Sequence, residues 1–261
     1  MTKTKCNANK TPIWFKLLIL PIVVVALSIA LWQIWQILNP NIQDAQATSE
    51  IAAIANDCED DFSILAYFFD DSPSPYQTQA QLEAAERRLI NWEALRAQNS
   101  EIAAWIYIPN TTVDYAITHT NNNQFYLNHD AFRRRNNAGA VFIEASHKSD
   151  FSLPDTILYG HHMRNMRKFG LLERYKNREF REGHRYIFIY TPEYTRRFAH
   201  SEQFISPTMR IDPAERDDKV LSLITCDYTP GHTHFIVRSE LYRLLLPGGT
   251  LVNRPIESED E

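Results

Sequence analysis

The sequence predicts a mainly β protein whose strands close into a barrel, with helices before the barrel. From Ile102 onward, apolar residues recur at every second position in eight short runs, and Asn, Pro or Gly lies in the turns between them. Many short strands with few helices are typical of a closed barrel or a sandwich. Only Met166 to Tyr175 has helical spacing among these runs. The expected strands are Ile102–Ile108, Val113–Ile117, Ala140–Ile143, Thr156–Tyr159, Tyr186–Tyr190, Arg197–Phe204, Val220–Thr225 and Phe235–Leu241.

The N-terminal segment 13–38 predicts a single transmembrane helix. Its centre, LLILPIVVVALSIALWQIW, carries no charge, and the segment is long enough to cross a bilayer. Lysines precede it and acidic residues follow it, so the positive-inside rule puts residues 1–12 in the cytoplasm and the rest outside. We therefore expect a single-pass protein of the cell membrane with an extracytoplasmic folded domain. A cleaved signal peptide, with Ala45-Gln46-Ala47 as the cleavage site, is the alternative.

Residues 39–75 have the composition of an acidic, extracytoplasmic stalk. Asn39-Pro40 is expected to close the helix, since Pro lacks the backbone donor that a helix needs. No Lys or Arg lies between residues 41 and 75, and acidic residues resist packing into a core. An amphipathic helix from Gln77 to Gln98 then opens the folded domain, which we expect to span residues 76–247. Residues 248–261 form an acidic C-terminal tail.

The composition excludes several functions. The chain of 261 residues has only 7 glycines and neither a G-x-G-x-x-G nor a G-x-x-x-x-G-K-[ST] motif, so we expect no nucleotide cofactor. The net charge is −5 and no basic stripe is present, so nucleic acid is not an expected partner. The 3 cysteines lie in three different regions and form no C-x-x-C pair.

Cys226 is the leading candidate for a catalytic residue. It ends an apolar strand, where a side chain can face a groove, and it is followed by a turn around Pro230-Gly231. A free thiol outside the cytosol is a candidate nucleophile, and a nucleophilic thiol needs a nearby base or cation. His161 and His162 follow the strand Thr156–Tyr159 and offer the base, although adjacent side chains point in different directions, so at most one of them faces Cys226.

Arg238, on the strand that returns from the turn, offers a fixed cation. In a hairpin symmetric about Pro230-Gly231, Cys226 would lie opposite Phe235 and Arg238 opposite Leu223. Side chains alternate along a strand, so Arg238 would then lie on the other face of the sheet from Cys226. A shared site therefore requires a shift of one residue in this turn.

Zinc is a competing interpretation. Cys226, His232 and His234, together with His161 or His162, are of the residue types that bind zinc. No H-E-x-x-H motif and no known ligand spacing is present, so we expect no metal.

The motifs resemble those of the sortases, membrane-anchored cysteine transpeptidases of Gram-positive bacteria, and of class B in particular. Over about residues 77–244 the class B pattern recurs in order: NSEIAAWIYIPNTTVDYAI, NNNQFYLNHD, AGAVFIEA, ILYGHHM, KFGLLERY and LITC. The resemblance implies a closed sortase-type β-barrel with N-terminal helices. It implies that Cys226 is the nucleophile, that His161 protonates the leaving amine, and that Arg238 steadies the substrate and the tetrahedral intermediate.

The implied reaction is acyl transfer through a thioester. The resemblance implies cleavage after the Thr of a C-terminal sorting motif in secreted proteins, and transfer to an amine of a peptidoglycan precursor or a pilin. Thr225 and Asp227 flank the nucleophile and are the candidates for substrate binding. Two departures stand out: Ile224 lies where class B enzymes often carry Ser, and the segment from Phe204 to Lys219 is short for the class. A hydrolase without transfer and a membrane-tethered binding module remain the alternatives.

Overall fold

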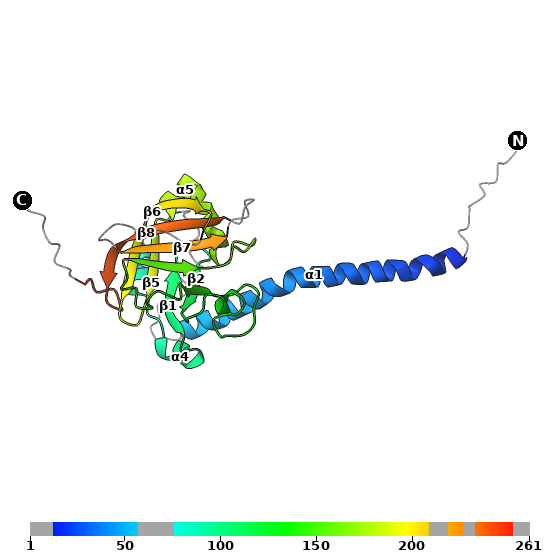
Figure 1. The fold of residues 1–261 in the computed structure, drawn as a ribbon, viewed down its shortest axis with the longest axis horizontal. Coiled ribbons are helices and arrows are strands. Elements are labelled where there is room, and N and C mark those ends of the chain that lie inside the picture. The colour runs from blue at the N-terminus through cyan, green and yellow to red at the C-terminus, as the bar shows by residue number, and fades with distance from the viewer. Residues whose placement is uncertain (1–12, 57–75, 209–218, 227–232, 253–261) are drawn as a thin grey trace, which may run out of the picture. The chain divides into compact units, whose positions relative to one another are not determined.

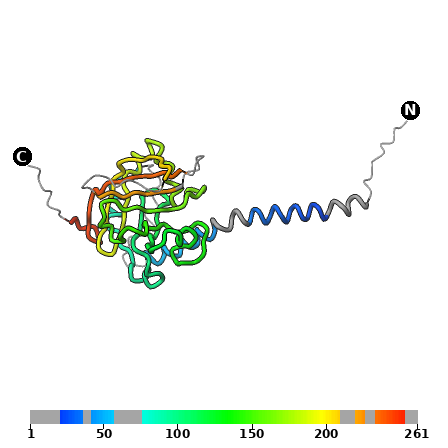
Figure 2. Tube along the Cα trace, in the orientation of Figure 1, coloured from blue at the N-terminus to red at the C-terminus, as the bar shows by residue number. Residues whose placement is uncertain are grey.

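The computed structural model describes residues 13–56, 76–208, 219–226 and 233–252, and for residues 13–20, 36–41 and 226 it describes the backbone alone. Figure 2 marks undescribed residues in grey. The chain divides into two compact units, Met1–Gln43 and Asp44–Glu261. The helix α1 (Ile13–Ala55) begins in the first unit and ends in the second. Its part in the first unit carries exposed large apolar side chains between Ile22 and Trp35. Over the residues described, no helix combines the length and apolar character needed to cross a membrane, so the predicted anchor stays a prediction.

The second unit is a closed barrel of eight strands in the order β1-β2-β3-β4-β7-β8-β6-β5 (Figure 1). Each expected strand is present, so the prediction of a mainly β barrel is confirmed. Two neighbouring pairs, β2 with β3 and β4 with β7, are parallel, and the others are antiparallel. The strands are β1 (Ile102–Tyr107), β2 (Asp114–Thr118), β3 (Val141–Ile143), β4 (Asp155–Tyr159), β5 (Tyr186–Tyr190), β6 (Thr195–Ser206), β7 (Val220–Cys226) and β8 (His234–Leu245).

Alternation along the strands divides the apolar residues between the barrel interior and two clusters outside it. Leu221 and Leu223 on β7 belong to the interior cluster, as do Phe235 and Val237 on β8. Their neighbour Ile224 belongs instead to an outer cluster. Burying one such side chain contributes roughly 1.5–3 kcal/mol, so this pattern fixes the register of each strand. The outer cluster contains Tyr126, Ala140, Phe142, Ile157, Tyr159, Ile224 and Ile236.

The expected single helix from Gln77 to Gln98 is wrong, because two helices occupy this stretch. These are α3 (Gln79–Arg87) and α4 (Trp92–Gln98). Between them, the Arg88 guanidinium donates to Asp114 at 2.8 Å and lies over the rings of Trp105, Tyr107 and Tyr190. Asn91 then caps α4 by accepting from the Ala94 N–H. The contacts of Arg88 with the barrel therefore stabilise the break between α3 and α4 more than a continuous helix would.

The expectation that Asn39-Pro40 ends the first helix is also wrong, since α1 continues to Ala55. Residues 44–55 are thus no stalk: Ala47, Ile51 and Ala55 are buried, and Ile51 and Ala55 pack in the cluster that α3 and α4 form with β1, β2 and β5. The lost donor of one Pro costs the helix a single hydrogen bond. Apolar burial and the ion pairs of Asp44 described below offset that cost.

The helix expected from Met166 to Tyr175 is a 3₁₀-helix over Phe169–Lys176, called η2, and a short helix, α5 (Arg178–Gly183), follows it. A further 3₁₀-helix, η1 (Phe125–Leu127), precedes β3. Asn177 caps α5 by accepting from the Phe180 N–H at 3.2 Å. The segment is helical as predicted, with the tighter 3₁₀ winding in place of the α-helix.

Candidate active site

The ends of β4 and β7 lie side by side and bring two of the predicted site residues to one edge of the barrel. The two strands are parallel, with Tyr159 paired with Ile224, and the Gly160 N–H donates to the Ile224 carbonyl at 3.2 Å. His161 and Cys226 are each two residues beyond the Tyr159–Ile224 pair. Parallel strands end at the same edge of a sheet, so the chain positions of His161 and Cys226 are neighbours.

The register between β7 and β8 has the one-residue shift that a shared site requires. Cys226 pairs with His234 and Ser222 pairs with Arg238. Directly opposite residues share a face of a sheet, and residues two apart on a strand do too. Positions 222 and 226 therefore lie on the same face as positions 234 and 238. Arg238 thus shares a face of the barrel with the position of Cys226, the outer one.

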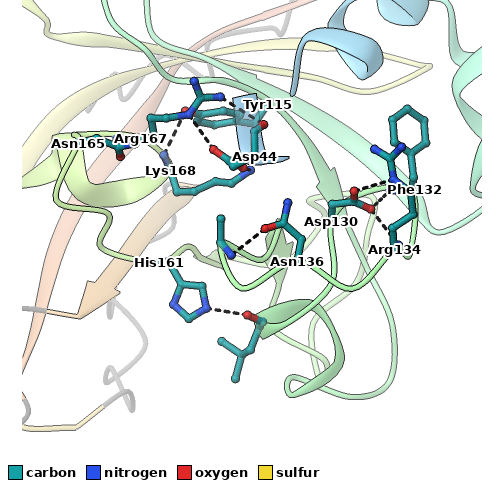
Figure 3. Close-up of polar contacts among 12 residues, drawn as sticks. Asp44, Tyr115, Asp130, Phe132, Arg134, Asn136, His161, Asn165, Arg167 and Lys168 are labelled. Carbon is teal, nitrogen blue, oxygen red and sulfur yellow. Dashed lines mark hydrogen bonds and ion pairs between the residues drawn. The ribbon is translucent and has the colours of Figure 1, made fainter. Parts of the chain in front are cut away.

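The His161 ring is oriented by a backbone carbonyl. Its Nε2 lies 2.7 Å from the Leu127 carbonyl oxygen at the end of η1, a contact that Figure 3 shows. A carbonyl can only accept, so Nε2 carries the hydrogen, and in the neutral ring Nδ1 holds the lone pair. Nδ1 is therefore the atom that can take a proton from a thiol.

Gly139 makes room for this arrangement. Its φ is +60°, and a Cβ there would lie 2.6 Å from the Tyr126 carbonyl oxygen, 2.9 Å from that of Leu127 and 3.1 Å from Cδ2 of His161. A glycine supplies both the left-handed conformation and the close approach. Any larger side chain at this position would push apart the imidazole and the carbonyl that orients it.

His162 has a different surrounding from its neighbour. Its Nε2 lies 3.1 Å from a carboxylate oxygen of Glu173 in η2, and its side chain is nearly buried. The two adjacent histidines therefore point to different partners, as the sequence predicted.

Arg238 lies in a row of polar side chains that crosses four strands on the outer face. Its guanidinium contacts Glu202 on β6 at 3.1 Å and Asp155 on β4 at 3.8 Å. Asp155 in turn accepts from the Ser222 hydroxyl at 2.9 Å. Burial raises the pKa of Asp155, while Ser222 and Arg238 favour its charged form.

These contacts hold Arg238 level with Ser222. Ser222 and Cys226 are four residues apart on β7, about 13 Å at ~3.3 Å per residue. Asp155 pairs with Val220, two residues further from Cys226. Arg238 is therefore on the predicted face, but its strand position is remote from that of Cys226, and its role at the thiol stays a prediction.

The loop that carries His161 is fastened to α1 by buried ion pairs. Asp44 is fully buried, Lys168 Nζ lies 2.9 Å from its Oδ1, and Arg167 Nε donates to its Oδ2 at 2.7 Å (Figure 3). Lys168 has φ +50° and ψ −129°, a sparsely populated conformation that costs a residue with a side chain on the order of 1–3 kcal/mol. Its N–H donates to the Tyr115 hydroxyl at 3.0 Å, and it forms a β-bridge with His162. The ion pairs thus support a strained residue of the His161 loop.

The remaining predicted positions are less informative. Thr225 is 1% exposed and pairs with Phe235 of the interior cluster, so its register puts it on the inner face, and a substrate contact there stays a prediction. Asp227 and His232 lie outside the described residues. Within the described part of the chain, no three His, Cys, Asp or Glu residues are grouped to hold a metal ion.

Several residues of the site were missed from the sequence. Asp155 and Glu202 are adjacent to Arg238 only because β4 and β6 flank the β7–β8 pair, and the sequence gives no sign of that strand order. Gly139 carried a usable signal, since this glycine-poor chain places it directly before a strand. His234 was considered only as a zinc ligand, yet it is the residue opposite Cys226.

Comparison with curated proteins confirms the resemblance to class B sortases. A segment of 90 residues is 30% identical to Sortase B of Listeria monocytogenes, and it covers 34% of this chain and 37% of that protein. A segment of 96 residues is 32% identical to Sortase B of Staphylococcus aureus, covering 37% of this chain and 39% of that protein. The chain thus spans less than half the length of these relatives. No family model matches the chain.

Solved structures confirm the sortase fold. Sortase B from Bacillus anthracis in complex with AAEK1 has a TM-score of 0.59 at 20% identity, over 78% of this chain and 98% of that one. A Staphylococcus aureus sortase B–substrate complex has a TM-score of 0.53 at 23% identity, over 58% of this chain and 84% of that one. A sortase B complexed with triglycine has the same score and identity, over 58% of this chain and 85% of that one.

Proposed function

We propose that this chain is a sortase-type cysteine transpeptidase, which cleaves a C-terminal sorting motif of secreted proteins after Thr and transfers the acyl group to an amine. The observation that supports it most is the junction of β4 and β7, where His161 and Cys226 each follow the Tyr159–Ile224 pair by two residues. The class B resemblance and the barrel agree with this reaction.

The proposed chemistry follows from a thiol beside an imidazole. Cys226 gives its proton to Nδ1 of His161, and the thiolate attacks the carbonyl carbon of Thr. The tetrahedral intermediate collapses, the C–N bond breaks, and His161 returns the proton to the leaving amine. The thioester is then attacked by a second amine, which restores the thiol. Arg238 contributes a fixed positive charge on the face where this occurs.

The partners are proposed from the resemblance and from two solved relatives. Staphylococcus aureus sortase B has been captured with substrate, and a sortase B has been captured with triglycine. For this chain we propose a sorting-signal peptide as acyl donor, and a peptidoglycan precursor or a pilin as the source of the acceptor amine.

The location is proposed from the N-terminal sequence. Segment 13–38 would anchor the protein in the cell membrane with residues 1–12 in the cytoplasm, and the exposed apolar side chains of α1 between Ile22 and Trp35 support this role. The catalytic unit outside the membrane would include residues 44–55 together with the barrel, because that part of α1 packs in the same unit.

Transfer is distinguished from hydrolysis by adding an amine acceptor. The full-length protein in detergent is incubated with a library of sorting peptides, with and without triglycine, and the products are separated by mass. Ligated peptide that appears only with triglycine supports a transpeptidase. Cleaved peptide at equal rates with and without triglycine, and no ligated product, would indicate a hydrolase. Loss of cleavage with a chelator would indicate zinc chemistry.

A further inference from the structure

His234, the first residue of β8, lies directly opposite Cys226 in the β7–β8 pair. The Cβ atoms of residues that face each other on antiparallel strands are about 4.5–5.5 Å apart. Arg238 lies opposite Ser222, four residues further along β7. Of these two residues on β8, His234 is therefore the one whose backbone position brings it next to the proposed nucleophile.

The surroundings of His234 leave its ring able to take a ligand. The side chain is partly buried, and the Nδ1 atom is buried without a hydrogen-bond partner among the residues that the structure describes. Leaving a buried polar atom without a hydrogen-bond partner costs the folded state roughly 1–3 kcal/mol. Burial also lowers the pKa of His234, which favours the neutral ring, and a neutral imidazole donates through one N–H.

The proposed reaction needs a hydrogen-bond donor at this place. When Sγ of Cys226 bonds to the carbonyl carbon, the π electrons of the C=O bond move to oxygen, and that oxyanion must be stabilised. A neutral imidazole can fill this role, as in enzymes where a neutral His polarises a carbonyl. We propose that His234 is a catalytic residue that donates a hydrogen bond to the oxyanion formed at Cys226. This inference rests on the proposed role of Cys226 as nucleophile.

The step needs no further reactant. His234 keeps its proton throughout, the thiol proton passes to His161, and the leaving amine takes it when the C–N bond breaks. Ion pairs with Glu202 and Asp155 keep the Arg238 guanidinium beside Ser222. Its positive charge is therefore on the same outer face as the Cys226 position but four residues away along β7.

The test uses two small probes of the full-length protein that require no sorting motif. Acetylation of Cys226 by p-nitrophenyl acetate passes through an oxyanion, whereas alkylation by iodoacetamide displaces iodide and forms none. Both rates are followed as the mass gain of the peptide that contains Cys226, for the wild type, His234→Ala, His234→Gln and a surface control, Glu182→Gln, whose carboxylate pairs with the exposed Arg178. Loss of one oxyanion donor typically costs on the order of 10²-fold in rate.

We expect His234→Ala to acetylate on the order of 10²-fold more slowly while its alkylation rate stays within about threefold. His234→Gln, which keeps an N–H donor, should recover part of the loss and also serves as the folding control. Glu182→Gln, which changes only an exposed ion pair, should acetylate within about threefold of the wild type. Equal acetylation of His234→Ala and the wild type would overturn the inference, as would a parallel loss of alkylation, which would make His234 a base for the thiol. Wild-type acetylation no faster than that of a free peptide cysteine would overturn it too.

Failure of the inference and failure of the proposed function give different results. If sorting peptides acylate Cys226 but His234→Ala acetylates normally, the transpeptidase stands and the donor is another group. If acetylation depends on His234 but no peptide of the library is cleaved or ligated, His234 keeps its role and the sortase-type function fails.

Discussion

Cys226 and His234 face each other across the β7–β8 pair, one residue away from the register of a symmetric hairpin. This register has two consequences. It brings Arg238 onto the face of the Cys226 position, which a symmetric hairpin would not do. It also makes an imidazole, not the guanidinium, the direct neighbour of that position.

Cys226→Ala should abolish cleavage and transfer while the barrel stays folded. A lone cysteine at a strand end contributes little to stability, but the proposed thioester forms on its thiol. We expect loss of at least about 10³-fold in kcat/KM with the peptide that the wild type cleaves. Retained peptide affinity together with retained turnover would point to a different nucleophile. Affinity without turnover in both proteins would fit the binding module.

Gly139→Ala should slow acylation by displacing the Leu127 carbonyl from His161. The new Cβ would lie 2.6 Å from the Tyr126 carbonyl oxygen, and a catalytic group misplaced by about 1 Å costs roughly 10²-fold. Gly248→Ala is the matched control, because Gly248 also has positive φ but nothing within 4 Å of its would-be Cβ. Both variants should lose roughly 1–2 kcal/mol of stability from backbone strain. Similar acylation rates in the two variants would contradict the role of Gly139.

Asp44→Asn should destabilise the barrel unit strongly. The substitution keeps the shape of the side chain but leaves Lys168 buried without its carboxylate, and breaking a buried pair in this way costs about 3–5 kcal/mol. Burial lowers the pKa of Lys168, and the Asp44 carboxylate opposes that shift by favouring the charged ammonium. Urea denaturation measures the loss.

The control for Asp44 is Glu182→Gln. Glu182 pairs with Arg178 at 2.7 Å, but both side chains are exposed, so the loss should stay below about 1 kcal/mol. A loss for Asp44→Asn no larger than this would mean that residues 44–55 do not fold as part of the barrel unit.

The free energy of unfolding should fall as the pH drops below about 6.5, in part because of His184. Burial lowers the pKa of His184 in the folded state from 6.5, so the unfolded chain binds more protons at mildly acidic pH and stability rises with pH through this range. His184→Asn cannot titrate there, and its amide can still donate to the Phe180 carbonyl that the His184 ring contacts at 3.0 Å. Denaturation curves at pH 5.5 and 7.5 should show a smaller difference for the variant. An equal difference in both proteins would contradict the assignment.

The strands were predictable because their signal is local. In runs such as Val220–Thr225, successive side chains pack alternately inside and outside the barrel, so the local sequence indicates the strand. The breaks in the helices were not predictable, because their causes are distant in sequence. Asp44 holds α1 beyond Pro40 through Arg167, which is 123 residues away. Arg88 ends α3 by pairing with Asp114 on β2.

The candidate site was predictable in its members but less in its geometry. Cys226 and His161 could be found from strand ends, since β4 and β7 had to terminate where the polar residues begin. The row formed by Asp155, Ser222 and Arg238 depends on the parallel pairing of β4 with β7, which no local pattern encodes. The position of His234 depends on a one-residue shift in the β7–β8 register. Hydrophobic alternation favours the observed register, because it sets Leu223 opposite Val237 inside the barrel, whereas symmetry about Pro230-Gly231 would set Leu223 opposite Arg238.

The central claim is that Cys226 is an acylated nucleophile, and peptide mass spectrometry of the full-length protein tests it most directly. The protein is mixed with the sorting-peptide library in the absence of any amine acceptor, quenched in acid and digested. We predict a mass increase equal to the peptide up to its Thr, located on Cys226, removed by hydroxylamine and absent from Cys226→Ala. A folded protein that gains no adduct with any peptide, or an adduct on a residue other than Cys226, would contradict the claim.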